Sequence, residues 1–145
     1  MINIKKLYLG ADRMIKIKIC IICFILLFLG ACANNVVDSY YKEVTSEEAK
    51  SLIDENDDLI IIDVRSEEEY TLGRLKDAIS IPYDMLINQL DKINNFKKKK
   101  VLIYCNSGNR SDNVIPVLIR EGFTKIYNMV DGISNWNYET FEEDI

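Results

Sequence analysis

The chain has 145 residues, with 18 basic and 23 acidic side chains, four cysteines and no histidine. This length accommodates one domain and a short targeting segment. The absence of histidine excludes Ser-His-Asp hydrolysis, Cys-His proteases and zinc sites with imidazole ligands. Any chemistry must therefore use other side chains.

Residues 1–31 resemble the signal peptide of a bacterial lipoprotein. Lys16 and Lys18 precede an apolar block over residues 19–29. Eleven residues are too few to span a bilayer core, which needs about 20, but they suit the apolar region of a signal peptide. Leu29-Gly30-Ala31 then has the pattern of a lipobox, directly before a cysteine.

Cys32 is expected to carry the lipid and to begin the mature chain, with residues 32–39 as a short tether. The protein would then be held outside the cytoplasm, on a bacterial membrane, by its lipid anchor alone. Translation from Met14 would give a leader of more usual length. A buried hydrophobic helix or an uncleaved anchor is the alternative interpretation of the apolar block.

This interpretation leaves Cys105 as the one thiol of the mature chain that carries no lipid. Cys20 and Cys23 have redox-motif spacing but lie inside the apolar block, where a thiolate would be poorly solvated. A single thiol forms no internal disulfide, so Cys105 is either an inert core residue or a nucleophile. The predicted mature chain has a formal net charge of −9, which disfavours nucleic acid and anionic headgroups as partners.

The predicted soluble domain covers residues 40–142. In its first half, sequence patterns typical of helices and strands alternate. Two capping boxes predict helices, one opening at 45–48 and ending at Asp54 or Glu55, the other opening at 66–69. The unbroken apolar run 59–62 predicts a strand buried on both faces. A short strand over 78–81 and a helix from Tyr83 to about Ile93 follow.

The second half continues the alternation. Residues 101–104 form a second buried strand that leads directly into the polar loop 105–110. A helix ended by Gly122, a strand over 125–129 and a closing helix around Trp136 complete the chain. The pattern predicts an α/β fold, a parallel sheet with helices on both faces and ligands at the carboxyl ends of its strands.

Cys105 lies at such a carboxyl end, where a helix begins directly after the loop. Backbone N–H groups and the positive end of the helix dipole favour thiolate over thiol there, and we expect the loop to expose the sulfur. Gly108 allows the backbone to curl, and Arg110 either adds positive charge near the loop or locks the loop to the scaffold. A buried structural cysteine is the alternative.

A second strand end carries Asp63 and Arg65. Both are expected to support the site as scaffold rather than to act in catalysis. The spacing of Arg65 and Glu69 would also allow these two residues to pair on a helix.

Four motifs follow one another within residues 40–140: Asp63-Val64-Arg65 through Ile81-Pro82, Cys105-Asn106-Ser107-Gly108-Asn109-Arg110-Ser111, Glu121-Gly122-Phe123, and Asp131-Gly132-Ile133 to Trp136. In this order they resemble the motifs of the single-domain rhodaneses. Three positions depart from the family pattern or from helix chemistry. Arg74 stands in place of a histidine, Asp131 replaces a glycine, and Pro116 is expected to kink its helix.

The resemblance implies sulfur transfer. Cys105 would attack a sulfane donor such as thiosulfate and hold the sulfur as a persulfide, cradled by the loop amides of residues 106–110, namely Asn106, Ser107, Gly108, Asn109 and Arg110. A thiol, or cyanide in the test tube, would accept the sulfur. Related phosphatases have one more residue between cysteine and arginine, so this loop disfavours phosphoryl transfer.

The resemblance implies no metal or organic cofactor, a small sulfur-containing anion as donor, a thiol as acceptor, and a monomeric domain. A binding module at the cell envelope, with the same fold and no catalysis, is the second hypothesis; the intact loop argues against it. A thiol redox relay is disfavoured because the mature chain has no resolving cysteine.

Overall fold

The computed structural model describes residue 18 and residues 40–142, so the predicted leader and tether lie outside the described residues apart from Lys18. The chain divides into two units, residues 1–36 and 37–145, and every strand and helix named below belongs to the second. Among the described residues, no helix combines the length and apolar character needed to cross a membrane.

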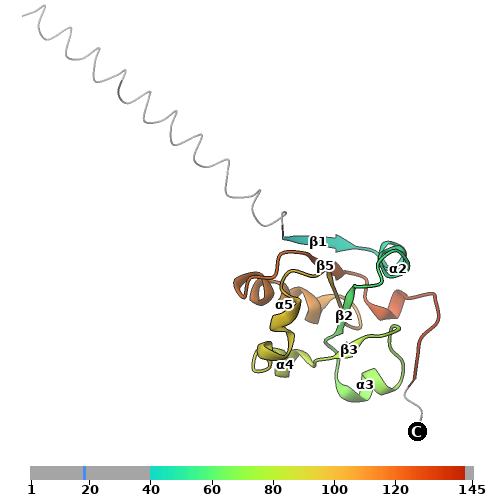
Figure 1. Ribbon diagram of the computed structural model, residues 1–145. Helices are drawn as coiled ribbons and strands as arrows, with labels where there is room; N and C mark the ends of the chain where they lie inside the picture. The colour runs from blue at the N-terminus through green and yellow to red at the C-terminus, as the bar shows by residue number, and fades with distance from the viewer. Residues whose placement is uncertain (1–17, 19–39, 143–145) are drawn as a thin grey trace, which may run out of the picture. The chain divides into compact units, whose positions relative to one another are not determined.

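Five parallel strands form one sheet in the order β1-β5-β4-β2-β3 (Figure 1). Their bounds are Tyr41–Val44 for β1, Ile60–Asp63 for β2, Ile79–Ser80 for β3, Val101–Tyr104 for β4 and Ile126–Met129 for β5. The β4 strand lies at the centre, between β2 and β5. The predicted parallel α/β architecture is confirmed, and β4 and β2, the two strands whose ends carry the candidate residues, are neighbours.

The sheet separates two hydrophobic cores, and β4 contributes alternate side chains to each. Val101, Ile103 and Cys105 pack in one core with residues of α5 (Asn109–Arg120) and α4 (Tyr83–Leu86). Leu102 and Tyr104 pack in the other, together with α2 (Ser46–Asp54) and Tyr70 of α3 (Glu67–Thr71). Side chains alternate across a strand, so a sheet with both faces covered needs this continuous apolar run.

Both predicted capping boxes are present. The Thr45 side chain accepts from the Glu48 N–H while Glu48 accepts from the Thr45 N–H, which starts α2. Ser66 and Glu69 make the same reciprocal bonds at the start of α3. The α5 helix also ends as predicted, with Gly122 at a φ of 91° directly after its C-cap.

Two predicted helices differ from the structure, and one strand was not predicted. The helix expected from Tyr83 to Ile93 breaks into α4 and the 3₁₀ helix η1 (Leu90–Phe96), because Gln89 leaves the helical region at a φ of −125°. The closing helix is one 3₁₀ turn, η2 (Ile133–Asn135), and Trp136 follows it in an extended conformation. The β1 strand was not predicted; it is four residues long and pairs only with β5 within the described sheet.

Candidate functional site

Cys105 follows the last residue of β4, and the loop after it turns into α5 at Gly108. Gly108 has a φ of 89°, and a Cβ at this position would overlap the carbonyl group of Val130. The turn therefore requires glycine both for its dihedral angle and for its close approach to the next loop. The expectation that the loop exposes the sulfur is wrong: Cys105 is 1% exposed and packs in the core cluster that contains residues of α4 and α5.

The electrostatics of the loop favour the ionised form of Cys105. Burial raises the pKa of the thiol, but the backbone N–H groups of Ser111, Ser107 and Arg110 favour the thiolate and together lower that pKa below its ordinary value. Hydrogen bonds to the charged form stabilise it, and here they outweigh the cost of desolvation. The loop therefore favours the thiolate of Cys105 more than an ordinary environment would, without a neighbouring base.

Ser111 is a member of this site that the prediction of the cradle left out. Its side chain is buried, its hydroxyl donates to the Gly108 carbonyl at 2.8 Å, and its N–H, with a smaller contribution from its side chain, lowers the pKa of Cys105. One sequence feature could have identified Ser111: it lies in the first turn of the helix that begins at Asn109, where backbone N–H groups have no intrahelical partner. Among the predicted cradle residues, Asn106 and Asn109 contribute carbonyl groups that accept from Ser134 and Asn113.

A second loop, residues 130–134, packs against the backbone of the cysteine loop. The Ile133 N–H donates to the Cys105 carbonyl at 2.9 Å, and the Ser134 N–H donates to the Asn106 carbonyl at 3.0 Å. Gly132, at a φ of 65°, lies so close that a Cβ there would overlap the Asn106 carbonyl group. The shape of the cysteine loop is thus set by backbone contacts as well as by its own sequence.

Arg110 locks the loop to α3. Its guanidinium makes two hydrogen bonds to the Glu69 carboxylate, at 2.6 and 2.7 Å. The Arg110 guanidinium holds the pKa of Glu69 at about 2. Glu69 in turn raises the pKa of Arg110, and Cys105 contributes to that increase, so the cation serves both the scaffold and the sulfur. A bidentate pair of this kind fixes orientation as well as charge.

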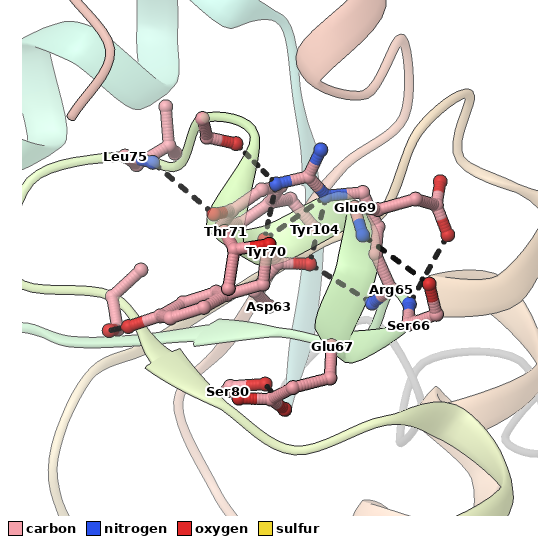
Figure 2. Close-up of polar contacts among 12 residues, drawn as sticks. Asp63, Arg65, Ser66, Glu67, Glu69, Tyr70, Thr71, Leu75, Ser80 and Tyr104 are labelled. Carbon is pink, nitrogen blue, oxygen red and sulfur yellow. Dashed lines mark hydrogen bonds and ion pairs between the residues drawn. The ribbon is translucent and has the colours of Figure 1, made fainter. Parts of the chain in front are cut away.

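Asp63 and Arg65 form a buried pair at the end of β2 (Figure 2). The guanidinium bonds both carboxylate oxygens, at 2.7 to 3.1 Å, and also donates to the Gly73 carbonyl at 2.6 Å. The pairing of Arg65 with Glu69 that their spacing would allow does not form, because Asp63 holds Arg65 and Arg110 holds Glu69. The Arg65 pair ties the end of β2 to the chain after α3.

A pocket of about 390 Å³ opens beside the loop. Val64 and Arg110 line it, and both adjoin the cysteine: the Val64 N–H donates to the carbonyl of Tyr104, and Arg110 follows in the same loop. Its other walls come from the start of α3 and from α4. The volume suits a small molecule. Within the described residues, no group of three or more Cys, Asp or Glu side chains is placed to hold a metal ion.

The departures from the family pattern have structural roles. The Arg74 guanidinium lies over the Tyr70 ring, 4.7 Å from its centroid, and the Arg74 backbone pairs with Phe141. The Asp131 carboxylate accepts from the Ser46 N–H at 3.1 Å, at the first turn of α2. The α5 helix runs from Asn109 to Arg120 with Pro116 inside it.

Comparison with known proteins gives a consistent result. The model of the family "Rhodanese-like domain" matches residues 45–139. A thiosulfate sulfurtransferase of Coxiella burnetii is 30% identical over 96 residues, which cover 66% of this chain and 87% of the relative. A tRNA uridine(34) hydroxylase of Cytophaga hutchinsonii is 33% identical over 106 residues, or 71% of this chain, but the match spans only 34% of the hydroxylase.

Comparison with solved structures points to the same family. The crystal structure of a rhodanese-like domain protein from Staphylococcus aureus superposes with a TM-score of 0.64 at 30% identity, covering 71% of this chain and 99% of that one. The family match, the relatives named sulfurtransferase and the loop geometry agree. The chain belongs to the rhodanese-like domain family, whose members include sulfurtransferases.

Proposed function

We propose that the protein is a sulfurtransferase that carries sulfane sulfur on Cys105. The Cys105 thiolate attacks the outer sulfur of a donor such as thiosulfate, a new S–S bond forms, and the donor S–S bond breaks to release sulfite. An acceptor thiolate, or cyanide, then attacks the outer sulfur of the persulfide, and Cys105 leaves as a thiolate. No oxidant or reductant is consumed.

The observation that carries this proposal is the set of backbone N–H groups around the Cys105 sulfur. They stabilise the thiolate that attacks, the thiolate that leaves and the negative persulfide between the two steps. A chain without histidine needs such a preformed anion site, because it has no imidazole base to activate the thiol. The low exposure of Cys105 fits a nucleophile that receives one sulfur atom rather than a bulky group.

The test is the intact mass of the protein after treatment with thiosulfate, with Cys105→Ser as the matched control. We expect the wild-type protein to gain the mass of one sulfur atom and to lose it on addition of cyanide, and the control to gain nothing. No gain from thiosulfate or from polysulfide, with the Cys105 thiol still titratable and the fold intact, would contradict the proposal. That outcome would support the non-catalytic binding module instead.

The pH dependence of persulfide formation gives a second check. Because the cradle lowers the pKa of Cys105, the reactive thiolate persists at pH values where an ordinary cysteine is protonated. The rate with excess donor should fall only as the pH drops through this lowered pKa. The Ser111→Ala variant should shift the same profile toward higher pH, since it removes a side chain that helps to lower the pKa of Cys105.

We also propose that the chain is a lipoprotein anchored through Cys32. The lipobox-like residues before Cys32 support this, and the first strand begins nine residues after it, at Tyr41. Metabolic labelling with an alkyne fatty acid in a bacterial host should mark the wild-type chain and Cys20→Ser but not Cys32→Ser. Equal labelling of all three would contradict lipidation at Cys32.

A further inference from the structure

Asn128 is a buried polar residue on the same face of the sheet as Cys105. It lies in β5, pairs in register with Ile103 of β4, and is fully buried. Residues in register in a parallel sheet point to the same face, and Ile103 packs in the core that contains Cys105. Asparagine is seldom fully buried, because an amide removed from water loses hydrogen bonds unless the protein replaces them.

The hydrogen bonds of the Asn128 amide are replaced only in part. Its Nδ2 donates to the Asp112 carboxylate of α5, whereas its buried Oδ1 has no hydrogen-bond partner among the described residues. The Tyr41 hydroxyl, which interacts with the Asn128 side chain, donates to Glu43 at 2.8 Å and so does not supply the missing proton. An unpaired buried acceptor destabilises the folded chain, and an apolar side chain of similar shape would avoid that cost.

The hydrogen bond to Asp112 reaches the part of α5 that serves Cys105. Asp112 follows Ser111 in the first turn of this helix. The same turn supplies the N–H groups of Arg110 and Ser111, which favour the thiolate. Asn128 therefore attaches this turn to β5, the strand next to β4 in the sheet.

From these contacts we infer that Asn128 is a positioning residue for Cys105. It acts through Asp112, and it holds the first turn of α5 in the orientation in which the N–H groups of that turn favour the thiolate. The inference deepens the proposed function, in which this thiolate is the nucleophile. The unpaired Oδ1 is then the stability that the domain gives up for a reactive Cys105.

Asn128→Leu should separate reactivity from stability. Leucine has nearly the shape of asparagine and leaves no buried acceptor unpaired, so the free energy of unfolding should stay at the wild-type value or rise. The turn of α5 loses its attachment, and the pKa of Cys105 should rise by about 0.5–1, as expected when one hydrogen bond to a charged group weakens. Below that pKa, persulfide formation should slow about three- to tenfold. A residue that merely fills the core would instead lower stability and leave the pKa of Cys105 unchanged.

Two variants of Asp112 test the same hydrogen bond from its other end. Asp112→Ala removes the acceptor, whereas Asp112→Asn keeps an oxygen that can accept from Asn128. Both variants remove the same negative charge, and that loss alone would lower the pKa of a nearby thiol. The difference between them therefore measures the hydrogen bond, and the pKa of Cys105 should be higher in Asp112→Ala. The double variant N128L/D112A should raise it no further than Asn128→Leu does, because both changes break one contact.

The pKa is measured on the full-length protein in a non-ionic detergent, from the ultraviolet absorbance of the thiolate as a function of pH. Subtracting the titration of the same protein with Cys105→Ser removes the signals of the other cysteines and of tyrosine. The matched control is Asn56→Leu, the same substitution at a partly buried asparagine before β2, where Nδ2 donates to the Leu52 carbonyl at 2.7 Å. This control should lower stability and leave the pKa of Cys105 at the wild-type value.

An unchanged pKa of Cys105 in Asn128→Leu, together with equal values in Asp112→Ala and Asp112→Asn, would overturn the inference while leaving the persulfide chemistry intact. If Asn128→Leu does not fold, the two variants of Asp112, an exposed residue, decide the question. A wild-type protein that takes up no sulfur from thiosulfate or polysulfide would overturn the proposed function alone. The thiolate titration needs no sulfur donor and would still report the effect of Asn128.

Discussion

At the scale of single residues, two glycines have backbone conformations that strain any residue with a Cβ, but the space around them differs. Gly132 and Gly122 both have a positive φ, 65° and 91°. A Cβ at Gly132 would overlap the Asn106 carbonyl group, whereas a Cβ at Gly122 would meet nothing within 4 Å. A comparison of the two positions therefore separates dihedral strain from the packing of the cysteine loop.

We predict that Gly132→Ala lowers the free energy of unfolding by about 2–4 kcal/mol, from left-handed strain plus overlap. Gly122→Ala should cost only about 1 kcal/mol, from strain alone. Because the overlap falls on the loop that holds Cys105, Gly132→Ala should also slow persulfide formation more than tenfold. Denaturant unfolding and the mass assay measure both effects. Equal stability losses, with unchanged persulfide formation in both variants, would contradict this account.

The sequence predicted the residues at this scale unevenly. Cys105, Arg110 and Gly108 stand out because a buried strand leads directly into a polar loop and a helix. The second loop left a weaker signal, since the need for Gly132 arises from a chain segment about 25 residues away. The ion-pair partners were harder still to predict. Arg65 and Glu69 have helical spacing, yet Arg65 pairs with Asp63 and Glu69 pairs with Arg110.

At the scale of elements, Glu69 joins α3 to α5. One of its carboxylate oxygens accepts from the Ser66 N–H in the capping box, and both accept from Arg110. The unfolded carboxyl has an ordinary pKa, whereas the folded pKa is about 2. A lowered folded pKa means that the stabilisation is complete above the unfolded pKa and is lost as the pH falls toward 2.

We predict that Glu69→Gln lowers the free energy of unfolding by about 0.5–1 kcal/mol at pH 7, because the pair is partly exposed and the glutamine still completes the capping box. The difference from the wild-type protein should shrink between about pH 4.5 and pH 2. Glu121→Gln is the control: its partner Lys97 is 3.7 Å away, and its loss should matter less. Stability curves for Glu69→Gln and the wild-type protein that run parallel at all pH values would contradict the assignment.

The elements themselves were predicted best where local chemistry alone determines them. Capping boxes start α2 and α3 through bonds within four residues, and the apolar runs of β2 and β4 specify burial on both faces. The β1 strand exists only because its backbone pairs with β5, more than 80 residues later. The break at Gln89 likewise lies in a stretch without proline or glycine, so no local signal marked it.

At the scale of the whole domain, the sheet keeps two sets of contacts apart. Cys105 packs in the core with α5, whereas Leu75 and Trp136 pack in the core on the other face. The chain after Trp136 folds back along that second side. The Trp136 indole N–H donates to the Glu139 carbonyl at 3.1 Å, and Arg74 and Phe141 exchange two backbone hydrogen bonds, both 2.9 Å.

We predict that this returning segment stabilises the domain without shaping the cysteine site. Phe141→Pro removes the N–H that bonds the Arg74 carbonyl and should lower the free energy of unfolding by about 1–2 kcal/mol. Phe141→Ala keeps both backbone bonds and isolates the contribution of the side chain. The rate of persulfide formation per folded molecule should stay at the wild-type value in both variants, because the altered contacts lie across the sheet from Cys105.

The single tryptophan makes this separation measurable, since its indole lies in the segment that the variant loosens. Denaturant unfolding followed by Trp136 fluorescence reports the second core, and the mass assay reports the first. If Phe141→Pro lowers stability and persulfide formation in proportion, the two faces are coupled through the sheet and the cysteine loop depends on the whole domain. If only stability falls, contacts near α3, α5 and residues 130–134 are sufficient to hold the anion site.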